Sequence, residues 1–155
     1  MKFNCPILII CWKRHEKVQN LIKKIKLVNP HKLYIFCDGP NDDYICEESV
    51  IKTRKIIDKS INWDCDIHKN YQSKNLGCKN GVSTAINWLF ENENKGIILE
   101  EDCLPEPSFF YFSELMLEKF YDKKQIFMIS GNYFLKDNTK KSNTYFFSKY
   151  PFTWG

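Results

Sequence analysis

Short apolar runs alternate along this chain with longer segments in which apolar residues recur every three or four positions. A short apolar run rich in β-branched residues is typical of a strand that is covered on both faces of its sheet. Helical recurrence of apolar residues predicts an amphipathic helix that packs on such a sheet. The apolar runs predict strands at residues 7–11, 33–37, 65–70, 96–99 and 126–129, and a short one at 145–147.

Helices are predicted in four of the intervening segments. The first is expected over 16–28 and is ended by Asn29-Pro30, and the last begins at Pro107, a residue suited to the first turn of a helix. The other two are expected from Asp42-Asp43 to about residue 59 and over 82–90. Strands that alternate with helices form βαβ units. The pattern therefore predicts an α/β, Rossmann-like fold, a mostly parallel sheet with helices on both faces.

Polar clusters follow the first four predicted strands. In open parallel sheets, ligands bind outside the carboxyl ends of the strands. These ends share one edge of the sheet, so residues far apart in the sequence are expected to meet there. The clusters are Lys13-Arg14-His15, Asp38-Gly39, Asn75-Leu76-Gly77 and Glu100-Glu101-Asp102.

Composition narrows the class of protein. The 155 residues are 43% hydrophobic and 15% aromatic, which suits one domain with a core and excludes a disordered or low-complexity chain. The net charge of +4 is mild, and lysines are scattered through the amphipathic segments, so we expect no nucleic-acid partner. No apolar run reaches the ~20 residues of a membrane-spanning helix, and no signal-peptide cleavage site is present. Seven cysteines without a CxxC pair indicate reduced thiols, so the expected localisation is cytoplasmic.

The acidic triplet Glu100-Glu101-Asp102 is the sharpest chemical feature. Adjacent carboxylates repel one another and raise each other's pKa unless a cation lies among them. Mg²⁺ is commonly held by one or two carboxylates together with substrate phosphates, and Mn²⁺ accepts the same oxygen ligands. The triplet therefore predicts a divalent-metal site, with a solvated acidic strand end as the alternative.

The other clusters are less specific. Asp38 can accept from a nucleobase N–H or from ribose hydroxyls, although Asp-Gly is also common in plain turns. Arg14 offers a rigid fork of donors for phosphate oxygens, or belongs to a solvated basic loop. Gly77, after Asn75, would let a ligand approach the backbone just ahead of a helix whose amino end favours anions, or the segment is an ordinary loop. The chain contains neither GxGxxG nor a P-loop motif.

Taken together, these motifs resemble the GT-A-fold glycosyltransferases that use nucleotide sugars, in particular the bacterial family-2-like enzymes related to animal N-acetylglucosaminyltransferases with an EDD motif. The most specific part runs from Ile98 to Pro105 and continues into Pro107-Ser108-Phe109-Phe110. Weaker pieces of the likeness lie at 6–14, 33–39, 75–77, 130–131 and 150–155, so the resemblance covers nearly the whole chain.

The resemblance implies a role for each site residue. Asp102 would hold Mn²⁺ or Mg²⁺ and bridge through it to the diphosphate. Asp38 would recognise the base, and Arg14 would contact the nucleotide or its phosphates. Glu101 stands where the family usually has Asp and would contact the ribose or sugar. Glu100, Asn75 and Gly77 complete the expected nucleotide-sugar site.

The resemblance also implies an activity. We expect a metal-dependent, inverting transfer of a sugar from a nucleotide-diphosphate donor, a UDP-sugar, to a glycan or polysaccharide acceptor. Residues 1–103 would form the nucleotide-sugar-binding half of a single GT-A-like domain, and 104–155 the start of the acceptor-side half. The general base is expected beyond Gly155, so we expect a chain truncated at its C-terminus. The alternative is a truncated, non-catalytic nucleotide-sugar-binding domain.

Aromatic residues crowd the last part of the chain, among them Tyr145, Phe147 and Tyr150. One interpretation is a core that a further segment would cover. The other is a peripheral association with a membrane.

Overall fold

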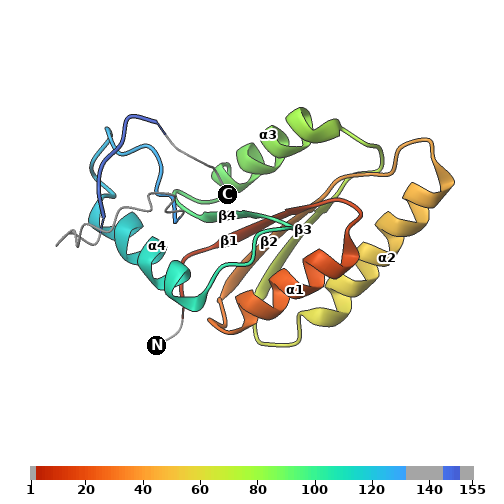
Figure 1. Cartoon of the computed structure of the whole chain (residues 1–155), viewed down its shortest axis with the longest axis horizontal. Helices are drawn as coiled ribbons and strands as arrows, with labels where there is room; N and C mark the ends of the chain where they lie inside the picture. Colours follow the sequence, from red (N-terminus) through yellow and green to blue (C-terminus); the bar gives the residue numbers. More distant parts are fainter. Residues whose placement is uncertain (1–2, 132–144, 151–155) are drawn as a thin grey trace, which may run out of the picture.

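A computed structural model of the chain describes residues 3–131 and 145–150 (Figure 1). Strands and helices alternate along these residues, and a parallel sheet with helices on both faces confirms the predicted α/β class. The elements are β1 (Ile7–Cys11), α1 (His15–Lys26), β2 (Lys32–Cys37), α2 (Tyr44–Ser60), β3 (Asp66–Tyr71), α3 (Gly77–Phe90), β4 (Ile97–Glu100) and α4 (Pro107–Lys119).

The sheet has the strand order β3-β2-β1-β4, and all its pairs are parallel. The central strand β1 pairs on both sides, with Ile9 opposite Ile35 of β2 and Leu99 of β4. The chain builds outward from β1 to β3 and then crosses to the other side of β1 to add β4. This change of direction between β1 and β4 is a topological switch point, where open α/β sheets bind ligands.

Helices cover the two faces of the sheet unequally (Figure 1). Successive side chains of a strand point to opposite faces. Ile7 and Ile9 belong to the larger core, which also holds Val18 of α1 and Phe110 of α4, whereas Leu8 belongs to a smaller one. The smaller core also contains Ile10, Tyr34, Phe36, Ala85 and Leu89, so within residues 3–131 and 145–150 the helix that packs on that face is α3.

Local signals account for several element boundaries. The Asp43 side chain accepts a hydrogen bond from the Ile45 backbone N–H, 3.1 Å, and so caps α2. Pro107 occupies the first turn of α4, as predicted. Helix α3 begins at Gly77, five residues before the expected 82–90, because its first turn is polar and exposed and adds nothing to the apolar stripe.

The strands predicted at 126–129 and 145–147 are wrong. Residues 126–129 form irregular chain after α4, where the Ile126 N–H donates to the Lys123 carbonyl, 2.8 Å, in a local turn. Phe127 is 99% exposed, so no sheet face buries this run. Residues 145–147 are also irregular, and Tyr145 packs by its ring against Phe120 of the α4 end. An apolar run becomes a strand only where a partner edge is available, and the run itself does not reveal this.

Within 3–131 and 145–150, no helix combines the length and the apolar character needed to cross a bilayer. Residues 151–155, which contribute to the resemblance, lie outside the described residues. The division at residue 103 stays a prediction.

Candidate functional site at the carboxyl edge of the sheet

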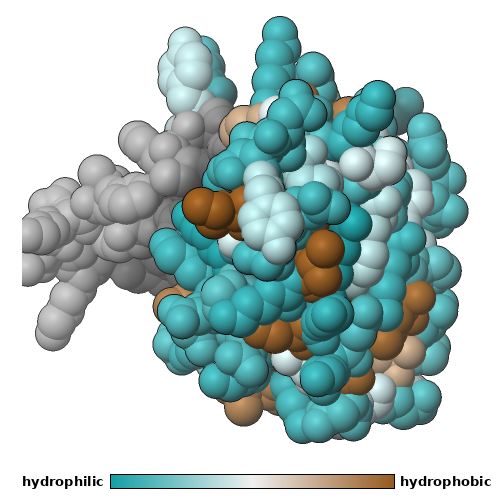
Figure 2. All heavy atoms as spheres, turned by 90° about the vertical axis from the view of Figure 1, so that its right-hand side faces the viewer, coloured by the Kyte–Doolittle hydropathy of each residue, from teal (hydrophilic) through white to brown (hydrophobic). Residues whose placement is uncertain are grey.

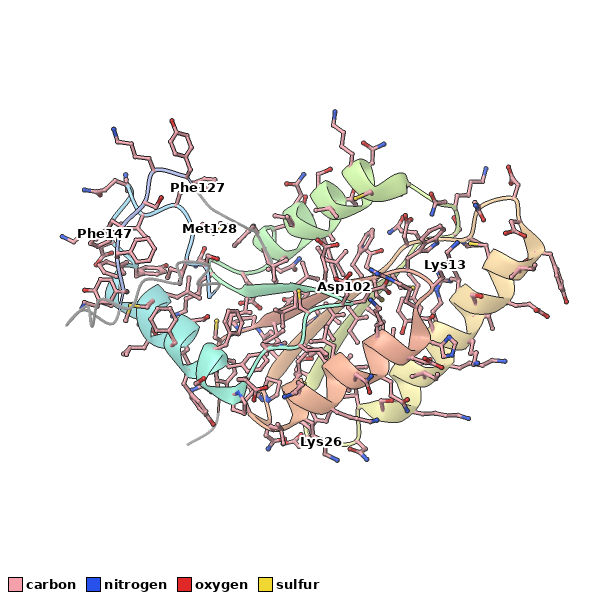
Figure 3. The ribbon with its side chains drawn as sticks, in the orientation of Figure 1. Lys13, Lys26, Asp102, Phe127, Met128 and Phe147 are labelled. Atoms are coloured by element: carbon pink, nitrogen blue, oxygen red, sulfur yellow. The ribbon has the colours of Figure 1, made fainter. Side chains whose placement is uncertain are left out.

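The carboxyl ends of β1, β2 and β4 come together as predicted. The ladder between β1 and β4 places Ile10 opposite Glu100, and the Glu101 N–H extends it by donating to the Ile10 carbonyl, 3.0 Å. On the other side, the Asp38 N–H donates to the Cys11 carbonyl, 2.9 Å. Lys13 and Asp102 accordingly lie toward the same end of the sheet in Figure 3.

The side chain of Glu101 is buried and joins the loop after β1 to the end of β4. One carboxylate oxygen accepts from the Trp12 backbone N–H, 3.0 Å, and the other accepts from Nε of Arg14. Nη1 of the same guanidinium donates to Oδ2 of Asp102, 3.0 Å. The pKa of Arg14 is raised above its ordinary value, chiefly because Glu101 accepts this hydrogen bond. Arg14 thus bridges two carboxylates of the acidic triplet across the switch point.

This geometry shows that Glu101 has a structural role, which is to hold the loop after β1. Both of its oxygens already accept from the loop after β1, and its side chain is only 5% exposed. A buried carboxylate with two donors holds those donors in place, because leaving it unpaired would be costly. The contact between Glu101 and a ribose or sugar stays a prediction.

Asp102 and Glu100 present the carboxylates that a cation could reach. Burial, reinforced by the nearby charge of Asp102, raises the pKa of Glu100 above its usual range. Arg14 contacts Oδ2 of Asp102, and the Asp102 side chain is 42% exposed, so solvent reaches it. Among the described residues, no three His, Cys, Asp or Glu side chains form a metal-binding group. The donor set fits a divalent ion that takes one or two carboxylates and completes its shell with phosphate and water.

Asp38 organises the opposite side of the edge. Its Oδ1 accepts from the backbone N–H groups of Gly39 and Leu76, 2.8 and 2.9 Å, and its Oδ2 accepts from Nδ2 of Asn75, 3.2 Å. Asn75 also donates to the Gly39 carbonyl, 3.1 Å. A Cβ at position 39 would lie 2.3 to 2.5 Å from the Lys74 backbone, so only glycine fits there. The structure therefore brings the predicted Asp38 and Asn75 into one network, which ties the end of β2 to the start of α3.

Helix α3 starts next to this network without a side-chain cap. Gly77 has φ +75°, a left-handed conformation that glycine adopts at little cost. Apart from Gly77, its two chain neighbours and the nearby backbone of its own helix, no heavy atom lies within 4 Å of where its Cβ would be, so the backbone there can be approached. No acidic residue stands in the first turn, but the Asp38 carboxylate, which accepts from the N–H of the capping residue Leu76, already places a negative charge at this positive end of the helix dipole.

Two residues at this edge were missed by the sequence reasoning. The Trp12 indole donates to the Gly39 carbonyl, 2.9 Å, and the Lys13 ammonium lies 4.0 Å from the centre of its ring. Arg54 of α2 donates from Nη2 to the carbonyls of Asp38 and Gln72, 3.2 and 2.6 Å. In the sequence, the position of Trp12 directly after an apolar strand could have identified it as a site residue. For Arg54 the sequence gives only a weak indication, namely a cation beside the buried positions of its helix.

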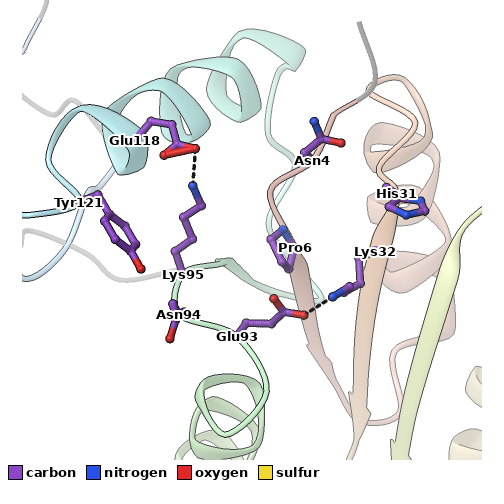
Figure 4. Close-up of a pocket in the computed structure, with 9 residues that line it drawn as sticks. All are labelled: Asn4, Pro6, His31, Lys32, Glu93, Asn94, Lys95, Glu118 and Tyr121. Atoms are coloured by element: carbon purple, nitrogen blue, oxygen red, sulfur yellow. Dashed lines mark hydrogen bonds and ion pairs between the residues drawn. The ribbon is translucent and has the colours of Figure 1, made fainter.

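A cavity lies at the other end of the sheet (Figure 4). Its volume is about 400 Å³, and its charged side chains are paired, Lys32 with Glu93 and Lys95 with Glu118, both at 2.6 Å. It is lined at the amino ends of β1 and β2, by Pro6 and Lys32 among others, and contains none of the residues predicted to bind a nucleotide sugar. The carboxyl edge is the better candidate, because the switch point and the acidic motif coincide there.

The class that the structure defines is an α/β protein with a parallel sheet and a charged cluster at its switch point. Comparison of the chain with models of protein families, with curated proteins and with solved structures found no match. The geometry of the edge and the motifs found in the sequence are therefore the features that bear on the function of this chain.

Proposed function

We propose that this chain is a metal-dependent glycosyltransferase of GT-A type that takes its sugar from a nucleotide-diphosphate donor. The observation that carries the proposal is the meeting of the Glu100-Glu101-Asp102 motif of β4 with Arg14 across the switch point. A site that concentrates carboxylates beside a guanidinium suits a ligand that brings both phosphate and a cation.

Different residues of the carboxyl edge would contact different parts of the nucleotide-sugar donor. Arg14 and Lys13 would face the phosphates, and the backbone N–H groups of the first turn of α3, from Gly77 on, would offer further donors. Asp38 is held rigidly by Gly39, Leu76 and Asn75, and such preorganisation suits recognition of a base or ribose. A glycan or polysaccharide is the proposed acceptor.

Asp102, with Glu100 beside it, would hold Mn²⁺ or Mg²⁺. Once bound, the ion would supply Lewis-acid stabilisation for the negative charge of the leaving diphosphate. Arg14 keeps the acidic loop aligned with the loop after β1 by bridging Glu101 and Asp102. Direct displacement at the anomeric carbon then inverts its configuration, and the acceptor hydroxyl loses its proton to a general base that is not assigned in this chain.

The test is calorimetric titration of the chain with UDP-sugars in the presence and absence of Mn²⁺. We expect Mn²⁺-dependent binding that Asp102→Asn weakens at least ~10-fold, since removing even a supporting residue of a metal site typically costs this much. The matched control is Glu106→Gln, an exposed carboxylate on the same loop. Equal affinity of Asp102→Asn and the unchanged chain would refute the metal assignment.

A turnover assay with the same nucleotide sugars separates the proposal from its alternative. Release of nucleoside diphosphate together with a glycosylated acceptor supports a transferase. Metal-dependent binding without transfer or hydrolysis would instead identify a non-catalytic nucleotide-sugar-binding domain.

A further inference from the structure

The positive charge of the chain is concentrated near its end. Residues 119–150 contain seven lysines and two aspartates, whereas the other 123 residues contain 16 Lys or Arg and 17 Asp or Glu. The net charge of the whole chain is +4, so it comes entirely from this segment. Residues 119–150 contain no arginine.

The same segment exposes large apolar side chains. Phe127 is 99% exposed, Tyr150 77% and Phe147 65%. Lys119, Lys123, Lys124 and Lys149 are exposed near them in the chain. We call this the cationic aromatic surface and define it by Lys119, Tyr121, Lys123, Lys124, Phe127, Met128, Phe147, Lys149 and Tyr150.

Ring contacts attach this surface to α4. Phe120, Tyr145 and Phe147 form a cluster with T-shaped geometry and centroid separations of 5.6 to 5.8 Å. The Lys119 ammonium donates to the Tyr145 hydroxyl, 2.8 Å, and lies 4.8 Å from the centre of its ring. Among the exposed aromatic residues, Phe147 is therefore held against the end of α4 by ring contacts.

The surface lies away from the carboxyl edge. In Figure 3, Phe127, Met128 and Phe147 occupy the left-hand end of the molecule, whereas Asp102 lies near its middle and Lys13 toward the other end. Figure 2, which looks onto that other end, shows a mainly hydrophilic surface with scattered apolar residues. The two ends thus differ in chemistry.

We infer that the cationic aromatic surface docks this protein onto a lipid bilayer that contains anionic headgroups. Aromatic side chains favour the membrane–water interface, and each lysine near an anionic leaflet adds attraction. A protein partner fits less well, since protein interfaces are depleted of lysine and enriched in arginine. Docking by this end would leave the carboxyl edge open. The docking surface contains none of the residues proposed to bind a nucleotide sugar, so membrane docking does not depend on the proposed glycosyltransferase activity.

The experiment is flotation of the 155-residue chain with phosphatidylcholine vesicles that contain or lack phosphatidylserine. We expect binding to the anionic vesicles that weakens as salt rises. Lys123→Gln with Lys124→Gln should weaken it about 25-fold at low salt, because each lysine near an anionic leaflet contributes roughly fivefold. Phe127→Ser with Phe147→Ser should weaken it at least ~10-fold, because apolar contact with the interface is lost.

Matched controls lie on α2. Lys52→Gln with Lys55→Gln removes two exposed lysines, and Tyr44→Ser with Ile45→Ser removes two apolar residues that are each 71% exposed. Both controls should float like the unchanged chain. Because every substituted residue is exposed, we expect each variant to fold, and its melting temperature verifies this.

Three results would overturn the inference. The first is the absence of flotation with anionic vesicles, and the second is equal loss in the α2 controls. The third is concentration-dependent self-association in sedimentation that Phe127→Ser with Phe147→Ser abolishes, because a second copy would then cover this surface.

Discussion

The role of Arg14 is specified by its contacts in the structure and not by its position in the sequence. Along the sequence it is one cation after an apolar strand, equally suited to phosphate binding and to a solvated loop. In the structure its guanidinium bridges Glu101 and Asp102, so a phosphate ligand would meet a group that is already oriented. Asp38 is also held in a fixed orientation, because its carboxylate accepts hydrogen bonds from three donors.

Gly77 allows a prediction at the same scale. Its φ of +75° disfavours any residue with a Cβ, and apart from its chain neighbours and the nearby backbone of its own helix nothing lies within 4 Å of the place a Cβ would take. Gly77→Ala should therefore lower the free energy of unfolding by about 1–2 kcal/mol through backbone strain alone. Gly77→Asn should cost less, because asparagine tolerates the left-handed region better. Urea denaturation of both variants measures the difference, and equal losses would argue against backbone strain as the cause.

At the scale of elements, β2 is tied to the loop between α3 and β4 by Glu93. Its carboxylate accepts from the Lys32 ammonium, 2.6 Å, and from the Tyr34 hydroxyl, 2.8 Å. Burial by itself would raise the pKa of Glu93, but these two hydrogen bonds outweigh it and lower the pKa. Burial, together with Glu93, raises the pKa of Tyr34 to about 12.

A pH dependence follows from the lowered pKa of Glu93. The ionised form is favoured in the folded state, so this contribution to stability is present above the unfolded-state pKa of about 4.3 and is lost as pH falls through the folded-state value. Glu93→Gln should lower the free energy of unfolding at pH 7 by about 1–3 kcal/mol and flatten its fall below about pH 4. Urea denaturation as a function of pH measures both effects. The exposed Glu91→Gln serves as control, and an unchanged acid profile for Glu93→Gln would contradict the assignment.

At the scale of the whole molecule, α4 is joined to the start of the chain through the larger core. Phe110 is fully buried, and its ring meets that of Phe3 edge-on at 6.0 Å. On the same helix, the Glu114 carboxylate accepts from the backbone N–H groups of Asn4 and Cys5, both at 2.9 Å. These contacts connect residues more than 100 positions apart and attach α4 to the sheet.

Phe110→Ala should lower the free energy of unfolding by about 3–5 kcal/mol, because it removes a fully buried ring and leaves a cavity. Small domains are typically stable by only about 5–15 kcal/mol, so the loss would be a large share of the total. Denaturation monitored by circular dichroism measures it. Leu115→Ala, which truncates a side chain that is 62% exposed on the same helix, should cost far less. Similar losses for the two variants would show that α4 does not pack as described.

The sequence by itself determined the first four strands, the helices between them and the edge where the polar clusters meet. It could do so because the period of apolar residues reports which face of an element is buried, and because the carboxyl ends of parallel strands share an edge. It erred at 126–129, where an apolar run has no partner edge and Phe127 is exposed.

Only the tertiary structure decided which residues of the edge touch. Glu101 and Arg14 are 87 positions apart, and they meet because β4 pairs with β1 rather than with β3. The contacts of Trp12 with Gly39 and of Arg54 with the end of β2 depend equally on strand order and helix placement. Local patterns record burial and turns within a few residues, whereas strand order arises from how the whole chain packs its apolar faces, and the geometry of the site follows from that order.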